Sequence, residues 1–359
     1  MSDRNRPSLF GASALYLLAS AGLWLVGLIL APQMPALFPG LSTEQLNLLI
    51  NLCYYLPFLF FPVALWATRR NGALRLNPLP LRLMVMSIFA ALICVLLIYD
   101  LSVFWMILCQ KLGLNVFTDS YVRPADNAEL MRSIIAGAVI APVCEELLFR
   151  GAMLSAWEAG GTRRAIGVTA VLFAILHGSV VGLPGELIAG LILGALVIWT
   201  DSLYAGMAFH TVYNAAVMML DYLSSSPDVV ESAAEVSLMQ TDLAAYFGGA
   251  ELAMLVAEIL VLGLMLTFIL RIFHMGAYVR EIQRTLAPDG SPEKMMEAAR
   301  RIPEGGTVLD QERSDQLRRG DFIPRAPLSP SAGTVLVIMA GVISSLGLYV
   351  FDLLSMLGG

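Results

Sequence analysis

The stretch Ala141-Pro142-Val143-Cys144-Glu145-Glu146-Leu147-Leu148-Phe149-Arg150 places two adjacent carboxylates and a guanidinium inside a segment that is otherwise apolar. This segment extends over about residues 129–153, which is long enough for a membrane-spanning helix. An ionisable side chain within such a helix costs roughly 2.5–3.5 kcal/mol on insertion scales and is usually retained because it serves a function. The stretch therefore predicts a membrane-embedded helix that carries a functional site.

The composition of the whole chain indicates a polytopic membrane protein. Of its 359 residues, 58% are hydrophobic and 14% are charged. A soluble domain has about 45–50% apolar and about 25% charged residues, so this excess of apolar residues is too large for one soluble core. Nothing in the sequence suggests nucleic-acid binding.

Nine apolar segments are long enough to be spanning helices, each of which needs about 20 residues. They are predicted at residues 9–31, 47–68, 83–106, 129–153, 164–182, 184–200, 202–223, 246–273 and 331–352. The first exceeds the apolar core of a signal peptide, about 7–15 residues, so we expect it to be retained. The predicted fold class is an all-α polytopic membrane protein of about nine transmembrane helices.

The Lys and Arg residues alternate between the two ends of these spans. They gather at the N-terminus, in the loop at 69–82, after the fourth span (Arg150, Arg163, Arg164), and in the loop at 274–330, whereas the loops at 32–46 and 224–245 have none. Because basic residues accumulate in cytoplasmic loops, we predict a cytoplasmic N-terminus and an outside C-terminus. A multi-pass protein of the inner (cytoplasmic) membrane is the expected localisation.

The spans divide the chain into five parts. These are the first three spans (1–128), a core of spans four to seven that holds the polar motifs (129–223), an outer loop with span eight (224–273), a cytoplasmic loop with a helical stretch near 292–302 (274–330), and span nine (331–359). The four cysteines lie in apolar segments, and no spacing among them suggests a zinc cluster or a disulfide framework.

Helical spacing separates the two glutamates. Glu146 and Arg150 are four residues apart, which places them on one helix face as an ion pair. Adjacent residues point about 100° apart, so Glu145 is left unpaired and free for proton chemistry. By itself, the Glu146–Arg150 pair could equally be a purely structural contact.

Two of the three histidines fall in apolar helices downstream. His177 follows Phe173 by four residues, and His210 precedes Asn214 by four. An imidazole and a carboxamide can donate to a developing oxyanion, and Glu145 with His177 could hold and activate a water. A lone membrane histidine is as often an interhelical hydrogen bond, but the coincidence of all these groups favours a reaction centre.

The depth of the groups along their helices gives a partial check. At ~1.5 Å per residue, Glu145 lies about 8 Å from a cytoplasmic end near Arg150, His210 about 14 Å from Asp201, and His177 about 20 Å from Arg164. We therefore expect a site entered from the cytoplasmic side, with His177 deeper than its partners.

Three motifs carry a family resemblance: Glu145-Glu146-x-x-x-Arg150, Phe173-x-x-x-His177 and His210-x-x-x-Asn214. Their order and helical context resemble the CPBP intramembrane proteases, which include the CAAX prenyl proteases of the Rce1 type. The resemblance covers about residues 129–223.

The resemblance implies a glutamate-dependent endopeptidase. By residue, it implies that Glu145 is the general base, that His177 helps to bind the nucleophilic water, that His210 and Asn214 form the oxyanion hole, and that Glu146 and Arg150 support the site. The implied substrate is a protein or peptide reached from the membrane or the cytoplasmic leaflet, and no cofactor is expected.

Several alternatives stay open. A zinc-dependent version would use two histidines and a carboxylate, although the chain has no His-Glu-x-x-His helix. A non-catalytic scaffold or immunity protein would retain the motifs for structure. A proton-coupled transporter would use Glu145, Glu251 and Glu258 as carriers, but no internal repeat supports it. A thiol protease is weaker, because Cys144 points away from Glu145 on the helix.

Overall fold

The computed structural model describes residues 8–68, 74–114, 124, 126–224, 248–285 and 330–358. Within these ranges the regular structure is helical, apart from one isolated bridge between Leu76 and Ser202. The predicted all-α architecture is confirmed. The helical stretch predicted near 292–302 lies outside the described residues.

The first three predicted spans correspond to helices α1 to α5. Their bounds are α1 (Leu9–Trp24), π-helical η2 (Leu25–Leu30), 3-10-helical η3 (Ala31–Gln33), α2 (Met34–Leu37), α3 (Thr43–Tyr54), π-helical η4 (Tyr55–Phe60), α4 (Phe61–Thr68) and α5 (Leu81–Lys111). A capping box of Ser42 and Gln45 starts α3. Pro57 lies within η4 and has no backbone N–H, which accounts for the interruption of the α-helical ladder there.

The next four helical passes include the three that carry the polar motifs. Their elements are α6 (Asn127–Ile134), π-helical η5 (Ile135–Ile140), α7 (Ala141–Glu146), π-helical η6 (Leu147–Met153), α8 (Leu154–Trp157), 3-10-helical η7 (Glu158–Gly160), α9 (Thr162–His177), α10 (Leu183–Thr200) and α11 (Leu203–Ser224). Elements α6 to α8 follow one another without a break, and we call residues 127–157 the α6–α8 rod. The α9 helix ends at His177, and not at 182 as predicted, because Gly178 takes a left-handed conformation (φ +67°) that terminates the helix.

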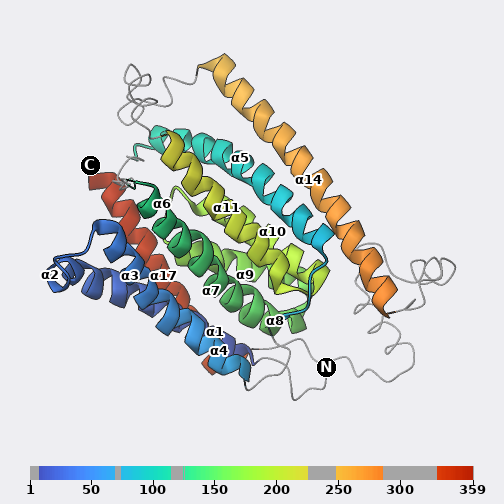
Figure 1. Cartoon of the computed structure of the whole chain (residues 1–359), viewed down its shortest axis with the longest axis horizontal. Coiled ribbons are helices and arrows are strands. Elements are labelled where there is room, and N and C mark those ends of the chain that lie inside the picture. Colours follow the sequence, from blue (N-terminus) through green and yellow to red (C-terminus); the bar gives the residue numbers. More distant parts are fainter. Residues whose placement is uncertain are drawn as a thin grey trace.

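Two long helices complete the described chain, α14 (Gly249–Thr285) and α17 (Ala332–Gly358). The prediction that a loop begins at residue 274 is wrong, because α14 continues through this position to Thr285. In Figure 1, α1, α3, α4 and α17 lie on one side of the bundle, α5 and α14 on the other, and the α6–α8 rod with α9, α10 and α11 between them.

The first and last helices run parallel. Gly341 packs against Tyr16, and further along both helices the indole N–H of Trp24 donates to the carbonyl of Ser344 at 2.8 Å. By contrast, helices that follow one another in the chain are antiparallel: Gly190 of α10 packs on Ala170 of α9, whereas the later Gly194 packs on the earlier Ile166. Parallel first and last helices in an alternating series require an odd number of passes.

Six helical segments of the described chain are long and apolar enough to cross a membrane, judged by length and composition. They are Leu9–Leu37, Thr43–Thr68, Leu81–Lys111, Leu183–Thr200, Gly249–Arg280 and Ala332–Leu357. The chain is therefore a multi-pass membrane protein. The other predicted spans, 129–153, 164–182 and 202–223, are present as the α6–α8 rod, α9 and α11, and the count of nine spans stays a prediction.

The two ends of the bundle differ in character. At one end Arg75 pairs with Glu158, which follows the α6–α8 rod, and lies 3.6 Å from Asp201, which follows α10. We call this the Arg75 end. The opposite end holds the turn between α9 and α10 at residues 178–182, and we call it the turn end.

Candidate active site

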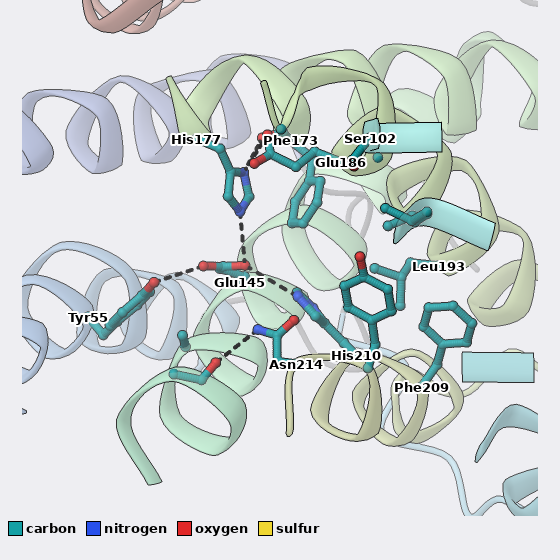
Figure 2. A pocket seen from close by; sticks show the side chains of 17 residues that line it. Tyr55, Ser102, Glu145, Phe173, His177, Glu186, Leu193, Phe209, His210 and Asn214 are labelled. Carbon is teal, nitrogen blue, oxygen red and sulfur yellow. Dashed lines mark hydrogen bonds and ion pairs between the residues drawn. The ribbon is translucent and has the colours of Figure 1, made fainter. Parts of the chain in front are cut away.

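A cavity of about 360 Å³ lies among the helices (Figure 2). Its polar lining residues are Tyr55, Ser102, Glu145, His177, Glu186, His210, Tyr213 and Asn214, and its apolar lining includes Ile98, Phe173, Leu193 and Phe209. The four residues expected to act directly on a substrate thus line one cavity, although they come from three separate helical passes.

Glu145 occupies the centre of the cavity. One carboxylate oxygen, Oε1, accepts a hydrogen bond from the Tyr55 hydroxyl at 2.9 Å. The other, Oε2, lies 3.9 Å from Nε2 of His177 and 3.8 Å from Nε2 of His210. These separations are too long for direct hydrogen bonds, and a shared water is the natural bridge across such a gap. Tyr55 therefore fixes the carboxylate with one oxygen facing both imidazoles.

Glu146 and Arg150 form a fully buried ion pair. The guanidinium Nη1 donates to Oε1 of Glu146 at 2.7 Å, and both side chains are 0% exposed. The second guanidinium nitrogen donates to the carbonyl of Gly190 at 3.2 Å, and the group lies 4.5 Å from the centroid of the Phe173 ring. The expectation that Arg150 stands near a cytoplasmic helix end is wrong, because the α6–α8 rod continues beyond it to Trp157.

A glycine makes room for this ion pair. A Cβ added to Gly206 would lie 2.5 Å from Oε2 of Glu146 and 3.0 Å from a methyl group of Val197. Only a residue without a side chain allows α11 to approach the Glu146 carboxylate this closely. The sequence analysis did not identify Gly206, since its importance depends on a contact between helices distant in sequence.

His177 ends α9 at the edge of the cavity. Its Nδ1 lies 2.8 Å from the carbonyl oxygen of Phe173, and because a carbonyl only accepts, Nδ1 carries the proton. In the neutral ring Nε2 is then an acceptor that faces Glu145. Glu186 lies 3.7 Å from the same Nδ1 and was also missed by the sequence analysis.

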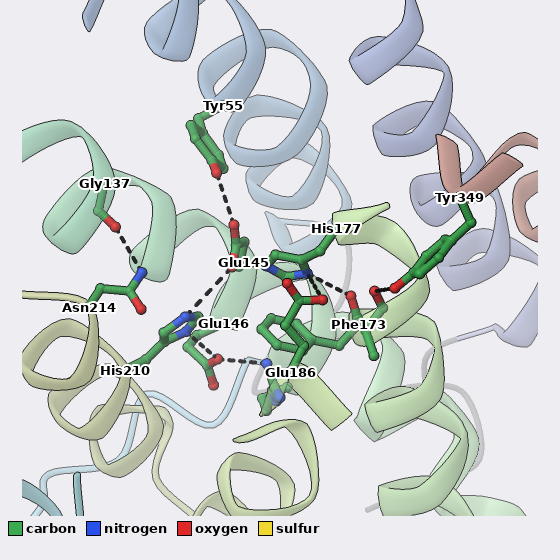
Figure 3. A network of polar contacts seen from close by, with 12 residues as sticks. Tyr55, Gly137, Glu145, Glu146, Phe173, His177, Glu186, His210, Asn214 and Tyr349 are labelled. Atoms are coloured by element: carbon green, nitrogen blue, oxygen red, sulfur yellow. Dashed lines mark hydrogen bonds and ion pairs between the residues drawn. The ribbon is translucent and has the colours of Figure 1, made fainter. Parts of the chain in front are cut away.

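The last helix holds the turn that follows His177. Asp352 of α17 accepts a hydrogen bond from the N–H of Val180 at 2.7 Å. Tyr349, one turn earlier, donates to the carbonyl of Ala174 at 2.8 Å (Figure 3). The α17 helix therefore positions the end of α9, although no polar motif lies on it.

His210 bridges the two glutamates. Its Nδ1 lies 3.1 Å from Oε1 of Glu146, whose carboxylate can only accept while it pairs with Arg150 (Figure 3). The proton of a neutral His210 therefore sits on Nδ1, and Nε2 is an acceptor toward Glu145. His210 can donate to an oxyanion only when both ring nitrogens are protonated.

Asn214 is held by the backbone of the α6–α8 rod. Its amide nitrogen donates to the carbonyl of Gly137 at 2.8 Å. In η5 the N–H of Ala141 pairs with the carbonyl of Ala136, five residues back. The corresponding partner of the Gly137 carbonyl would be Pro142, which has no N–H. Pro142 thus leaves this carbonyl available to orient Asn214, whose second amide hydrogen remains for the cavity.

The predicted mismatch in the depth of His177 disappears in the structure. At ~1.5 Å per residue, Glu145 lies about 18 Å before the end of the rod at Trp157, and His177 about 22 Å after the start of α9 at Thr162. The two groups are therefore level. Glu251 and Glu258, considered as cavity residues, lie on exposed positions of α14 and do not line this cavity.

The residues do not form a metal site as they are placed. No group of three His, Cys, Asp or Glu side chains among the described residues has a geometry that could hold a metal ion. Tetrahedral zinc with ligands at about 2.0–2.1 Å brings its ligand atoms about 3.4 Å apart. The 3.8 and 3.9 Å separations around Glu145 exceed this value.

The cavity occupies the half of the bundle nearer the turn end. Its lining along α10 runs from Gly182, beside the turn, to Leu193. The side chains of His177 and Glu186 are 30% and 21% exposed, against 9% for Glu145. The basic loops lie at the opposite end, the Arg75 end, and the expected access from their side stays a prediction.

Comparison with known proteins identifies the segment that contains these residues. Residues 127–216 match the family model described as type II CAAX prenyl endopeptidase Rce1-like. No curated protein and no solved structure matches the chain. The matched segment runs from the start of the α6–α8 rod into α11, and it includes all three motifs. This segment is therefore similar to the Rce1-like CAAX proteases.

Proposed function

We propose that this protein is an intramembrane endopeptidase in which Glu145 activates water to hydrolyse a peptide bond of a membrane-associated protein or peptide. The observation that carries the proposal is the position of the Glu145 carboxylate between two imidazoles, with one oxygen held by Tyr55. A carboxylate, a water site and nearby donors in one cavity are the parts that base-assisted hydrolysis needs.

The reaction begins with a water held between Glu145 and Nε2 of His177. Glu145 accepts one proton from this water while the oxygen attacks the carbonyl carbon of the peptide bond. The oxyanion that forms takes a hydrogen bond from the second amide hydrogen of Asn214, and another from His210 when that ring is doubly protonated. Glu145 then returns the proton to the amide nitrogen, and the C–N bond breaks to give a carboxylic acid and a free amine. The remaining proton of the acid passes to the amine, so the products leave as a carboxylate and an ammonium group.

The buried Glu146–Arg150 pair supports this arrangement without contacting the substrate. Glu146 sets the Nδ1–H tautomer of His210, and Arg150 holds the Glu146 carboxylate in place with a hydrogen bond. Such outer partners hold a reacting group within the narrow geometry that catalysis requires. Glu146 and Arg150 are therefore positioning residues.

For the membrane arrangement we propose nine spans with a cytoplasmic N-terminus in the inner membrane. The parallel packing of α1 and α17 supports an odd number of passes. The alternation of basic loops supports the orientation. Fusions of a reporter after Thr68 and after Ser224 test it, since the first is expected in the cytoplasm and the second outside.

The enzymatic proposal is tested by comparing the membrane and secreted proteomes of cells that carry the natural chain or Glu145→Gln. We expect at least one polypeptide to be shortened only with the natural chain. A non-catalytic scaffold predicts identical proteomes and an unchanged phenotype in Glu145→Gln. A strong chelator distinguishes the zinc-dependent alternative from the glutamate mechanism. A zinc-dependent enzyme would lose activity when its metal is removed, whereas an enzyme that uses Glu145 alone would keep its activity.

A further inference from the structure

The cavity is closed toward the Arg75 end by packed side chains. Beyond the Glu146–Arg150 pair lie side chains that are 0% exposed on the α6–α8 rod, α10 and α11: Phe149, Met153, Leu154, Leu196, Val197 and Leu203. Protein interiors of this kind are close-packed and leave no passage for a peptide. A substrate therefore does not reach Glu145 from the Arg75 end.

Exposure of the site residues increases in the opposite direction. The Glu146 side chain is 0% exposed, that of Glu145 9%, that of Glu186 21% and that of His177 30%. Glu186 is in the first turn of α10 and His177 is the last residue of α9, so both flank the 178–182 turn. The most exposed of these side chains therefore lie beside the 178–182 turn, at the turn end.

Charge distinguishes the two ends with respect to the membrane. Arginines at the Arg75 end include Arg75, Arg82, Arg163 and Arg164, joined by Arg280 near the end of α14. The described residues near the turn end carry mainly carboxylates, among them Glu44, Asp126, Glu129, Glu251 and Asp352. Because basic residues concentrate on the cytoplasmic side, the Arg75 end faces the cytoplasm and the turn end faces outward.

From these observations we infer that the active site receives an extracytoplasmic segment of a membrane-bound polypeptide, and not a cytoplasmic chain end. The inference rests on the proposed function for the reaction. It extends that proposal by assigning the side of the membrane on which the scissile bond lies. It replaces the expectation that substrate arrives from the cytoplasmic leaflet.

The charge of the lining favours an internal peptide segment over a chain end that carries a free carboxylate. The cavity is lined by the carboxylates of Glu145 and Glu186, and none of the described residues that line it is Lys or Arg. Arg150 is committed to Glu146 and to the Gly190 carbonyl. A substrate carboxylate held near the scissile bond would lie beside these two carboxylates, with no Lys or Arg of the lining to pair with it.

Cysteine labelling tests the direction of access without requiring catalysis. Ser102→Cys reports on the cavity, Lys111→Cys on the exposed turn end of α5, and Arg163→Cys on the exposed start of α9. A membrane-impermeant maleimide is applied to right-side-out and to inverted membrane vesicles, with the natural chain measuring the background from its own four cysteines. Ile98→Cys, which also lines the cavity, is the second reporter should Ser102→Cys fail to fold.

We expect the Ser102→Cys and Lys111→Cys variants to be labelled in right-side-out vesicles and not in inverted vesicles. We expect the Arg163→Cys variant to be labelled only in inverted vesicles. Labelling of the cavity reporter together with Arg163→Cys overturns the inference, as does cytoplasmic labelling of Lys111→Cys. A cavity reporter that reacts from neither side while both end reporters react overturns it as well.

The labelling experiment tests the direction of access and the proteome comparison tests the enzymatic proposal, so either claim can fail without the other. If Glu145→Gln leaves every proteome unchanged, the enzymatic proposal fails even when labelling shows an outward opening. If cleavage is lost in Glu145→Gln but the mapped cleavage sites lie in cytoplasmic segments, the enzyme stands and the direction of access is wrong.

Discussion

Arg150→Met is expected to destabilise the protein by about 3–5 kcal/mol, the typical effect of removing one partner of a buried ion pair. The substitution keeps an apolar side chain of similar length but leaves Glu146, which is 0% exposed, with His210 as its remaining hydrogen-bond donor. It also removes the contact of the guanidinium with the Gly190 carbonyl. Because total stabilities are about 5–15 kcal/mol, a loss of this size is readily measured.

Arg132→Met is the matched control on the same rod. The Arg132 side chain is 30% exposed and its guanidinium lies 3.8 Å from Glu129, three residues earlier. An ion pair with this exposure contributes about 0–1 kcal/mol. The same residue change is therefore expected to have a much smaller effect at this position.

The assay is chemical unfolding of both variants and the natural chain in the same detergent, followed by tryptophan fluorescence. The double variant Glu146→Leu/Arg150→Met is expected to regain much of the loss, because it leaves neither charge buried alone. Equal stabilities of Arg150→Met and Arg132→Met would refute the claim that the pair is buried and coupled. A double variant no more stable than Arg150→Met would refute the explanation by an unpaired carboxylate.

Three further substitutions test individual contacts. Tyr55→Phe removes a hydrogen bond to the Glu145 carboxylate, and a bond of this kind is worth about 1.5–3 kcal/mol. We therefore expect kcat to fall about 10- to 100-fold while circular dichroism shows an intact fold. An unchanged kcat would show that Tyr55 does not position the base. Gly206→Ala places a methyl group 2.5 Å from the Glu146 carboxylate, so unfolding is expected to become easier by about 1–3 kcal/mol. Gly263→Ala serves as the neutral control, because a Cβ added at this half-buried glycine meets no atom within 4 Å. Asp352→Ala is expected to lower kcat more than KM by freeing the 178–182 turn, with partial rescue by Asp352→Asn; equal activity in all three forms argues against a role for α17.

The helices themselves follow from local sequence, whereas several of their ends do not. Runs of about 20 apolar residues form helices wherever they occur, because backbone groups in hydrocarbon must be paired within the segment. The end of α9 depends on Gly178, whose left-handed conformation is accompanied by close packing against Leu348 of α17. This contact joins residues 170 positions apart, so the hydrophobic pattern alone extended the helix too far.

The candidate site was predictable to the extent that its spacing is helical. The four-residue spacing of Glu146 and Arg150 fixes their common face, and it predicts the ion pair that the structure contains. Tyr55 and Gly206 escaped identification because a tyrosine and a glycine in apolar helices carry no local signal, and their partners are set by packing between distant passes. The same reason applies to the place of the cavity in the half of the bundle nearer the turn end, which depends on how helices from distant parts of the chain pack together.

The measurement that tests the central claim most directly is hydrolysis by the purified protein in lipid nanodiscs, with a substrate identified from the proteome comparison. Glu145→Gln keeps the size of the side chain and an oxygen that can accept from Tyr55, but it cannot take a proton from water. Since general-base catalysis contributes about 10²- to 10⁴-fold, we predict that the cleavage rate falls by at least about a hundredfold, while a strong chelator leaves the natural chain active. Cleavage by Glu145→Gln at a rate close to that of the natural chain would contradict the assignment of Glu145 as the base.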